Sequence, residues 1–234
     1  MVQVNTPYPA TAYLTRFLRT HARDRGVVAV QDDPALTLVL RLLSREGLAT
    51  VRADLERSRR AVRRRASRRP RAAAPAEPAS VTSFLSQADR YVATVDAAVR
   101  FLQGGDPSLA LRIAGRAFLP EGPRFAALAP DGEPEVDEDA LGWAFGALGV
   151  TDRAKYLASL FVDDLADVVR DGVDARFELA RYGESLAASA PSFDDLRAAL
   201  DGEPTLIDRW VDEIAVELAA RHEPDLVALT VPFP

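Results

Sequence analysis

The sequence predicts an α/β fold that is rich in helix, with a partial parallel sheet of about three strands and a large all-helical insertion. Residues 2–33 have the pattern strand, helix, strand, and two strands joined by a helix lie parallel in one sheet. The same pattern returns near the other end, where a helix at 205–222 precedes an apolar run at 225–231. The sequence between them shows helical periodicity. The predicted domains are therefore 1–33 with 204–234, and a helical insertion at 34–203.

The first strand, helix and second strand are expected at 2–5, 10–26 and 27–33. Along the helix, apolar residues recur at helical spacing, which predicts that one side packs inward and the other faces water. Pro9 suits a first helical turn, and Gly26 suits a helix end. The apolar residues of this face are Tyr13, Leu14, Phe17 and Leu18.

The insertion is expected to contain a series of helices and one linker. Nine of the fifteen residues from Arg57 to Arg71 are arginine, and prolines follow at 70, 75 and 78. This composition predicts a disordered Arg/Ala/Pro linker at about 58–80. Capping residues mark several helix starts, including Thr151 and a Thr205–Asp208 capping box. Helices are expected at 34–47, from 48 up to the linker, and at 81–105, 109–118, 141–148, 151–172, 173–189, 192–201 and 205–222.

Composition limits the possible chemistry. No apolar run is long enough to span a bilayer and no signal segment opens the chain, so we expect a cytoplasmic protein with no membrane contact. The chain has no cysteine, which excludes thiol nucleophiles and iron–sulfur ligation within these residues. No Gly-rich phosphate loop and no Gly-x-Ser-x-Gly elbow is present. We therefore assign neither catalytic residues nor metal ligands.

Several charged residues allow two interpretations. Asp32 and Asp33 could bind ribose or Mg²⁺, but capping of the next helix is favoured. His21 and His222 could bind a metal, but placement at helix ends is favoured. The acidic row Asp163, Asp167 and Asp171 is favoured as a solvated stripe. The arginine tract could bind phosphates, yet it has no aromatic residues for base stacking, so a linker is favoured over nucleic-acid binding.

The loops at the carboxyl ends of the predicted strands are the best candidates for a ligand site. Two of them hold an aromatic residue between prolines, and rigid aromatic loops can form an apolar floor for a large flat cofactor. The same spacing also fits two tight turns that the prolines merely stiffen, and from spacing alone that interpretation is favoured over a cofactor site. The candidate cofactor-binding residues are Asn5, Thr6, Pro7, Tyr8, Pro232 and Phe233.

Several segments together resemble the N-terminal region of bacterial cobalamin-binding-domain radical S-adenosylmethionine proteins. The likeness covers nearly all of the chain outside the arginine tract and is not a catalytic motif. The segments are NTPYPATAYLTRFLR, LRLLSREGL, SFLSQADRYVATVDAAVRFLQGGDPSLALRIAGRAFLPEGPRF, LGWAFGALGVTDRAKYLASLFVDDLADVVRD, FELARYGESLA and DLVALTVPFP.

The resemblance implies a Rossmann-like cobalamin-binding half followed by a radical barrel that binds a [4Fe–4S] cluster and S-adenosylmethionine through C-x-x-x-C-x-x-C. That motif and the cobalamin motif D-x-H-x-x-G are absent here. We therefore expect a truncated, catalytically inactive cobalamin-type portion, with a corrinoid as ligand and a C-terminal radical domain or partner chain at the 225–231 strand edge. The alternative is a non-enzymatic helical interaction module.

Overall fold

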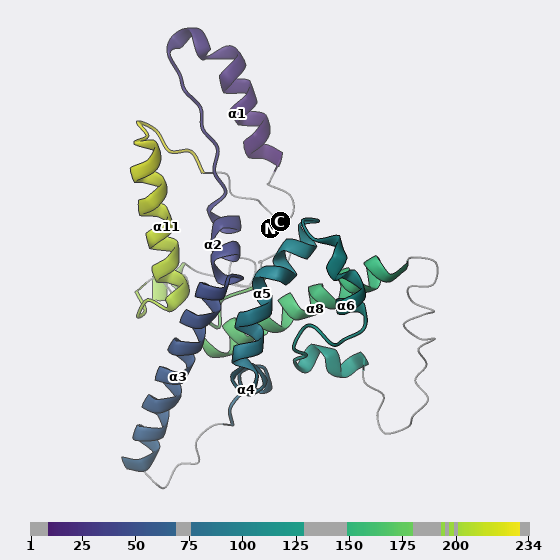
Figure 1. The fold of residues 1–234 in the computed structure, drawn as a ribbon. Helices are drawn as coiled ribbons and strands as arrows, with labels where there is room; N and C mark the ends of the chain where they lie inside the picture. The colour runs from purple at the N-terminus through teal and green to yellow at the C-terminus, as the bar shows by residue number, and fades with distance from the viewer. Residues whose placement is uncertain are drawn as a thin grey trace. The chain divides into compact units, whose positions relative to one another are not determined.

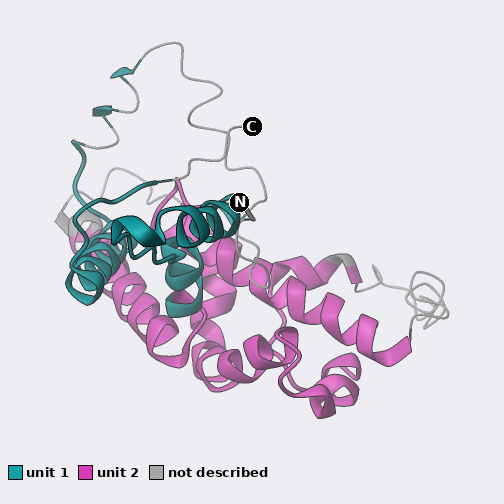
Figure 2. Ribbon diagram, turned by 90° about the horizontal axis from the view of Figure 1, so that it is seen from above, with its two compact units in different colours: residues 1–41, 178–234 teal, residues 42–177 magenta. Residues whose placement is uncertain are grey.

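The computed structural model describes residues 9–68, 76–128, 149–179, 193–194, 197–198 and 201–229 (Figure 1). Within these ranges every regular element is an α-helix or a 3-10 helix, and none is a strand. The chain divides into two compact units, one of residues 1–41 with 178–234 and one of residues 42–177 (Figure 2). The two units are described separately.

The predicted Rossmann-like parallel sheet is wrong for the described residues. Residues 27–33 and 225–229 form no strand, while 2–5 and 230–231 lie outside the described residues. Val28 is 88% exposed and Leu226 is 86% exposed, so neither run is buried between neighbouring strands. A strand depends on a partner for its hydrogen bonds and its packing, and an apolar run alone does not supply one.

The first unit contains α1 (Pro9–His21), the short 3-10 turn η1 (Arg23–Arg25), α2 (Pro34–Leu42) and α11 (Leu206–His222). Gly26 follows η1 with a φ of 73°, a conformation that glycine adopts without strain. The chain then returns along α1, where Arg19 Nε donates to the carbonyl of Ala29 at 2.8 Å and Gln31 Nε2 donates to Thr11 Oγ1 at 2.7 Å. Residues 27–31 therefore bond to a helix instead of a strand.

The start of α11 is the clearest success of the sequence prediction. Thr205 Oγ1 accepts from the backbone N–H of Asp208 at 3.2 Å, and the Asp208 carboxylate accepts from the N–H of Thr205 at 2.8 Å. This reciprocal pair confirms the predicted capping box and the helix at 205–222. The predicted domain of residues 1–33 with 204–234 was defined by a shared sheet. Its boundaries stay a prediction.

The second unit contains α3 and then a series of helices up to α8. It differs from the sequence prediction in several described places. The helix α3 continues to Arg68, where a linker was expected from about 58; the predicted helix at 81–105 breaks at Gln87; and Thr151 lies inside α8. Residues 173–179 are turn and irregular chain, where another helix was expected to begin. The elements are α3 (Arg45–Arg68), α4 (Ala79–Ser86), α5 (Ala88–Leu102), η2 (Pro107–Leu109), α6 (Ala110–Ala114), η3 (Pro123–Leu128) and α8 (Gly149–Gly172).

The core of the second unit forms around α8, which contacts α4, α5, α6 and η3, while α3 packs on α5 (Figure 1). Three aromatic rings occupy it. The ring of Tyr91 lies 5.4 Å from that of Phe161 in a stacked arrangement and 5.3 Å from that of Phe84. All three side chains are at most 1% exposed, and burial raises the pKa of the Tyr91 hydroxyl. Aromatic rings of this size supply much of the apolar area that a core removes from water.

Gly172 is required where α8 ends against two other helices. A Cβ atom at this position would lie 2.5 Å from Leu55 Cδ2 on α3 and 2.9 Å from Val81 Cγ2 on α4. Gly172→Ala is therefore expected to lower the free energy of unfolding by about 2 kcal/mol, measured by urea denaturation. On a Leu55→Ala background, which removes the closer of the two contacts, the same change should cost less, and equal costs on both backgrounds would contradict the overpacking argument.

Candidate functional site

The candidate cofactor-binding residues Asn5, Thr6, Pro7, Tyr8, Pro232 and Phe233 all lie outside the described residues. The structure does describe the segments that adjoin them in the sequence. Helix α1 begins directly after Tyr8, and residues 226–229 come just before the second loop. These two neighbouring segments carry the exposed apolar side chains discussed next.

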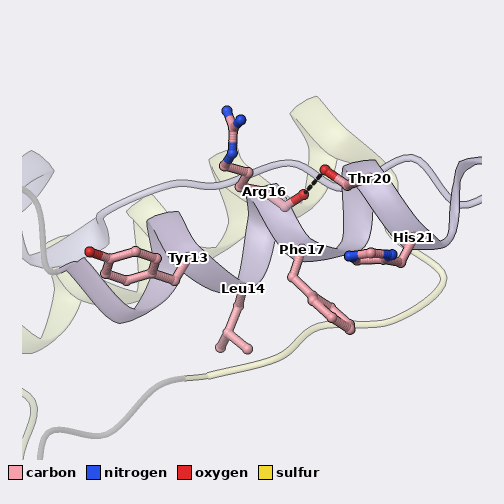
Figure 3. Close-up of a pocket in the computed structure, with 6 residues that line it drawn as sticks. All are labelled: Tyr13, Leu14, Arg16, Phe17, Thr20 and His21. Atoms are coloured by element: carbon pink, nitrogen blue, oxygen red, sulfur yellow. Dashed lines mark hydrogen bonds between the residues drawn. The ribbon is translucent and has the colours of Figure 1, made fainter.

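The apolar face of α1 is exposed. Tyr13 is 76% exposed, Leu14 52% and Phe17 59%, and these residues line an open pocket along the helix (Figure 3). The ring of Phe17 lies 4.6 Å from that of His21, one turn further along. The expectation that this face packs inward is therefore wrong for the described residues. A helix with this spacing can bury the face only against a surface, and here no such surface covers it.

Residues 226–229 form a second exposed apolar segment of the same unit. Leu226 is 86% exposed, Val227 67% and Leu229 81%. Removing large apolar side chains from water lowers the free energy of the system. Each segment therefore favours a ligand or partner that covers it. We call α1 residues Tyr13, Leu14, Phe17 and Leu18 together with Leu226, Val227 and Leu229 the apolar segments of the first unit.

The carboxylates of Asp32 and Asp33 bond to other groups of the first unit. Asp33 Oδ1 accepts from the backbone N–H of Leu36 at 2.9 Å, which confirms that it caps α2. Asp32 bonds instead to His222 Nε2, and its other oxygen lies 4.0 Å from Arg221 Nη1. Both carboxylates are therefore engaged within the first unit.

Two further ion pairs hold α11 to α2 in the same unit. Arg41 donates to Glu213 at 2.9 Å and to Glu217 at 2.8 Å. His21 and His222 are the last residues of α1 and α11, which confirms their placement at helix ends. Among the described residues no three His, Cys, Asp or Glu side chains are grouped so that they could hold a metal ion.

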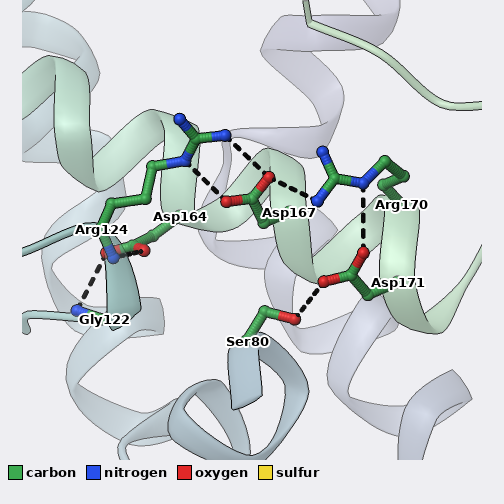
Figure 4. Close-up of polar contacts among 7 residues, drawn as sticks. All are labelled: Ser80, Gly122, Arg124, Asp164, Asp167, Arg170 and Asp171. Atoms are coloured by element: carbon green, nitrogen blue, oxygen red, sulfur yellow. Dashed lines mark hydrogen bonds and ion pairs between the residues drawn. The ribbon is translucent and has the colours of Figure 1, made fainter. Parts of the chain in front are cut away.

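A cluster of carboxylates and arginines lies on α8, and it contains a residue that the sequence analysis missed (Figure 4). Asp164 is only 2% exposed, and its two oxygens accept the backbone N–H groups of Gly122 and Arg124, each at 2.9 Å. It thereby holds the chain at the start of η3. A Cβ at Gly122 would lie 2.5 Å from Asp164 Oδ2, so only glycine allows this approach. The available signal was position: Asp164 falls on the apolar stripe of Phe161, Leu165 and Val168.

The neighbouring Asp167 pairs with two arginines. Arg124 Nε donates to Asp167 Oδ2 at 2.6 Å and Arg124 Nη2 to Oδ1 at 2.9 Å, while Arg170 Nη2 lies 2.9 Å from the same Oδ1. Asp171 accepts from Ser80 at 2.6 Å and from Arg170 at 3.1 Å. The interpretation as a solvated stripe is therefore wrong for Asp167, which joins α8 to η3. Asp171 is exposed, as that interpretation has it, and also bonds to Ser80 on α4.

Burial and charge shift two neighbouring pKa values in opposite directions. Burial raises the pKa of Asp164 above its ordinary value, and the two backbone N–H groups offset only part of this. Burial also acts to raise the pKa of Asp167, but the hydrogen bonds and charges of Arg124 and Arg170 outweigh it and lower the pKa. Perturbed carboxylates can mark functional sites, but these two carboxylates bond to backbone and side-chain groups of the protein itself. We interpret the cluster as structural.

Asp167→Asn is expected to lower the free energy of unfolding by about 1 kcal/mol at neutral pH, since it removes a bidentate ion pair. The folded-state pKa of Asp167 is below the unfolded value, so its stabilisation is present above that unfolded value and is lost as pH falls through the folded pKa. Urea denaturation at several pH values should show the difference from the parent protein shrinking below about pH 4. Asp212→Asn is the matched control, since it makes the same chemical change at an exposed position on α11.

Comparison with known proteins gives no match to a family model, a curated protein or a solved structure. No helix among the described residues combines the length and apolar composition needed to cross a membrane. In the described part of the chain, the apolar segments of the first unit expose large apolar side chains that a ligand or partner could cover. The charged side chains of the α8 cluster bond to one another and to neighbouring groups of the protein, which gives them a structural role.

Proposed function

We propose that this chain is the N-terminal, corrinoid-binding-type portion of a radical S-adenosylmethionine enzyme, and that it is not catalytic by itself. The proposal is supported by the likeness of six sequence segments to that family. The family assignment in this proposal rests on this likeness alone, because the described residues form no parallel sheet. The corrinoid would be contacted by the Pro–aromatic–Pro loops, through Asn5, Thr6, Pro7 and Tyr8 on one side and Pro232 and Phe233 on the other.

The chain's own residues limit which cofactors it could hold. A [4Fe–4S] cluster needs cysteine thiolates and the chain has none, so the cluster does not fit here. In this proposal the cluster and S-adenosylmethionine belong to a C-terminal radical domain. A corrinoid is large and mostly apolar on its faces, and contact with it can come from aromatic side chains without a protein ligand to the cobalt.

The observation that carries the proposal is the exposure of both apolar segments of the first unit. Each adjoins one of the two expected cofactor loops in the sequence, and each leaves large apolar side chains uncovered, with Tyr13 at 76% and Leu229 at 81%. Burying such side chains stabilises a complex by about 1.5–3 kcal/mol each. Binding of a flat cofactor, or of the radical domain that follows it, would supply that burial.

Titration of the purified chain with hydroxocobalamin tests the proposal, followed by visible absorbance and by calorimetry. We expect saturable binding that weakens about tenfold in Tyr8→Ala and in Phe233→Ala, because each change removes one aromatic contact. Phe193→Ala is the matched control, since Phe193 is 59% exposed and lies outside both loops. Absence of any response, or equal weakening in the control, would contradict corrinoid binding at these loops.

A second candidate function is a helical interaction module that binds through the α1 face, and the exposure of that face favours it. Helix α1 carries Arg16 and Arg19 but no acidic residue, whereas the whole chain has a net charge of −6. A second copy of the chain therefore offers a surface of complementary charge. Light scattering should show self-association that Phe17→Glu abolishes. Val216→Glu, at an exposed position on α11, is the control and should leave the association unchanged. A monomer at every concentration would count against this function.

A further inference from the structure

We propose that the second half of α3 binds the phosphate backbone of a double-stranded nucleic acid, without reading its sequence. The sequence interpretation favoured a linker over nucleic-acid binding for the arginine tract. The structure instead continues α3 as one helix from Arg45 to Arg68. We call Arg57, Arg60, Arg63 and Arg64, which are all exposed, the arginine surface. The inference is independent of the function proposed above.

The charge of α3 is balanced in its first part and unbalanced in its second. Arg52 is paired with Glu56 at 3.1 Å and with Asp89 at 2.6 Å. Arg57 lies 2.9 Å from Asp54, and Arg60 lies 3.7 Å from Glu56. Beyond that point, Arg63 and Arg64 have no acidic partner in the part of the chain that the structure describes. Positive charge therefore accumulates toward the end of the helix.

The helical form makes this charge costly unless an anion is present. Arg60 and Arg64 are four residues apart, and like charges at this spacing repel one another. Arg59 lies at the same spacing from Arg63, but its charge is offset by Glu77 at 3.1 Å. Arg57, Arg60 and Arg64 share one face and span roughly 10 Å along the axis. Because phosphates of one strand repeat at about 3.4 Å of duplex length, this face can meet several of them. A bound polyanion would replace the repulsion with attraction.

The composition of α3 favours a duplex over the other polyanions. Residues 45–68 contain no aromatic side chain, so the stacking platform that single strands require is absent. The large apolar side chain exposed in this half is Val62, at 49%, and an interfacial membrane helix needs a continuous apolar face. Backbone phosphates of a duplex need only exposed cations in a regular array.

Fluorescence anisotropy with a labelled DNA duplex of about 20 base pairs tests the proposal with the full chain. We expect sequence-independent binding whose log Kd depends on log salt with a slope of about 4, as four neutralised phosphates predict. The variant R57Q/R60Q/R63Q/R64Q should bind about tenfold or more weakly at low salt. The matched variant R16Q/R19Q/R23Q/R25Q, with the same change in charge on α1 and η1, should stay within about threefold of the parent.

A lysine variant of the same four α3 positions keeps the charge and is expected to bind within about threefold of the parent. Far-UV circular dichroism of each variant shows that a loss of binding is not a loss of the helix. Three results would overturn the proposal: no binding of the duplex at low salt, equal weakening by the α1 variant, or tighter binding of single-stranded DNA or phosphatidylserine vesicles than of the duplex.

Discussion

Phe161→Ala is expected to lower the free energy of unfolding by about 4 kcal/mol, the largest effect predicted for any single substitution here. Phe161 is 0% exposed on α8, and its ring stacks on Tyr91 at 5.4 Å between centroids. The change removes the apolar area of the ring and leaves a cavity where α5 meets α8. A domain stable by about 5–15 kcal/mol would lose a large part of its stability.

Urea denaturation, followed by far-UV circular dichroism, measures this loss. Phe193→Ala serves as the control, because Phe193 is 59% exposed and its removal should cost below about 0.5 kcal/mol. Phe161→Leu retains most of the volume and should cost about half as much as alanine. Similar midpoints for Phe161→Ala and Phe193→Ala would show that α8 does not pack on α5 as described.

Asp164→Ala is expected to cost about 3 kcal/mol, the second largest effect. The carboxylate is 2% exposed and accepts the N–H groups of Gly122 and Arg124, so alanine leaves two backbone donors without their acceptor. Hydrogen exchange gives a local measurement. The amides of residues 122 and 124 should exchange faster in the variant, because the bonds that protect them are gone.

The pH dependence of the same variant is a separate check. Burial raises the pKa of Asp164 in the folded protein, so the folded state binds a proton at a higher pH than the unfolded chain does. This group therefore lowers stability as pH rises from the unfolded pKa through the folded pKa, and Asp164→Ala should remove that slope. Asp171→Ala, an exposed position on the same helix, should cost below about 1 kcal/mol. If Asp171→Ala lowered the free energy of unfolding as much as Asp164→Ala does, the cost would not depend on burial of the carboxylate, contrary to the expectation.

The helices of the chain could largely be predicted because their signals are local. The capping box of Thr205 and Asp208 lies within four residues, and the apolar stripe of α8 repeats within each turn. The strands predicted at 27–33 and 225–231 are not formed by the described residues, because a strand exists only with a neighbour to pair with, and the local sequence does not supply one. The structure bonds residues 27–31 to α1 instead, through Arg19 and Gln31.

The charged residues show the same division. Sequence spacing correctly placed Asp33 as a cap and both histidines at helix ends, since each depends on its own helix. It did not indicate that Asp164 is buried against Gly122, because the two are 42 residues apart. Nor did it predict that α3 would carry the arginines as a helix to Arg68. The candidate loops at 5–8 and 232–233 stay predictions.

The amino-acid order alone determined where most helices form and how several of them are capped, since these are interactions between residues a few positions apart. It also excluded thiol and iron–sulfur chemistry, because the chain has no cysteine. Only the tertiary structure decided which apolar faces are covered, which carboxylates are buried and whether an apolar run becomes a strand. Those properties depend on contacts between distant segments, whose free energy no single segment contains.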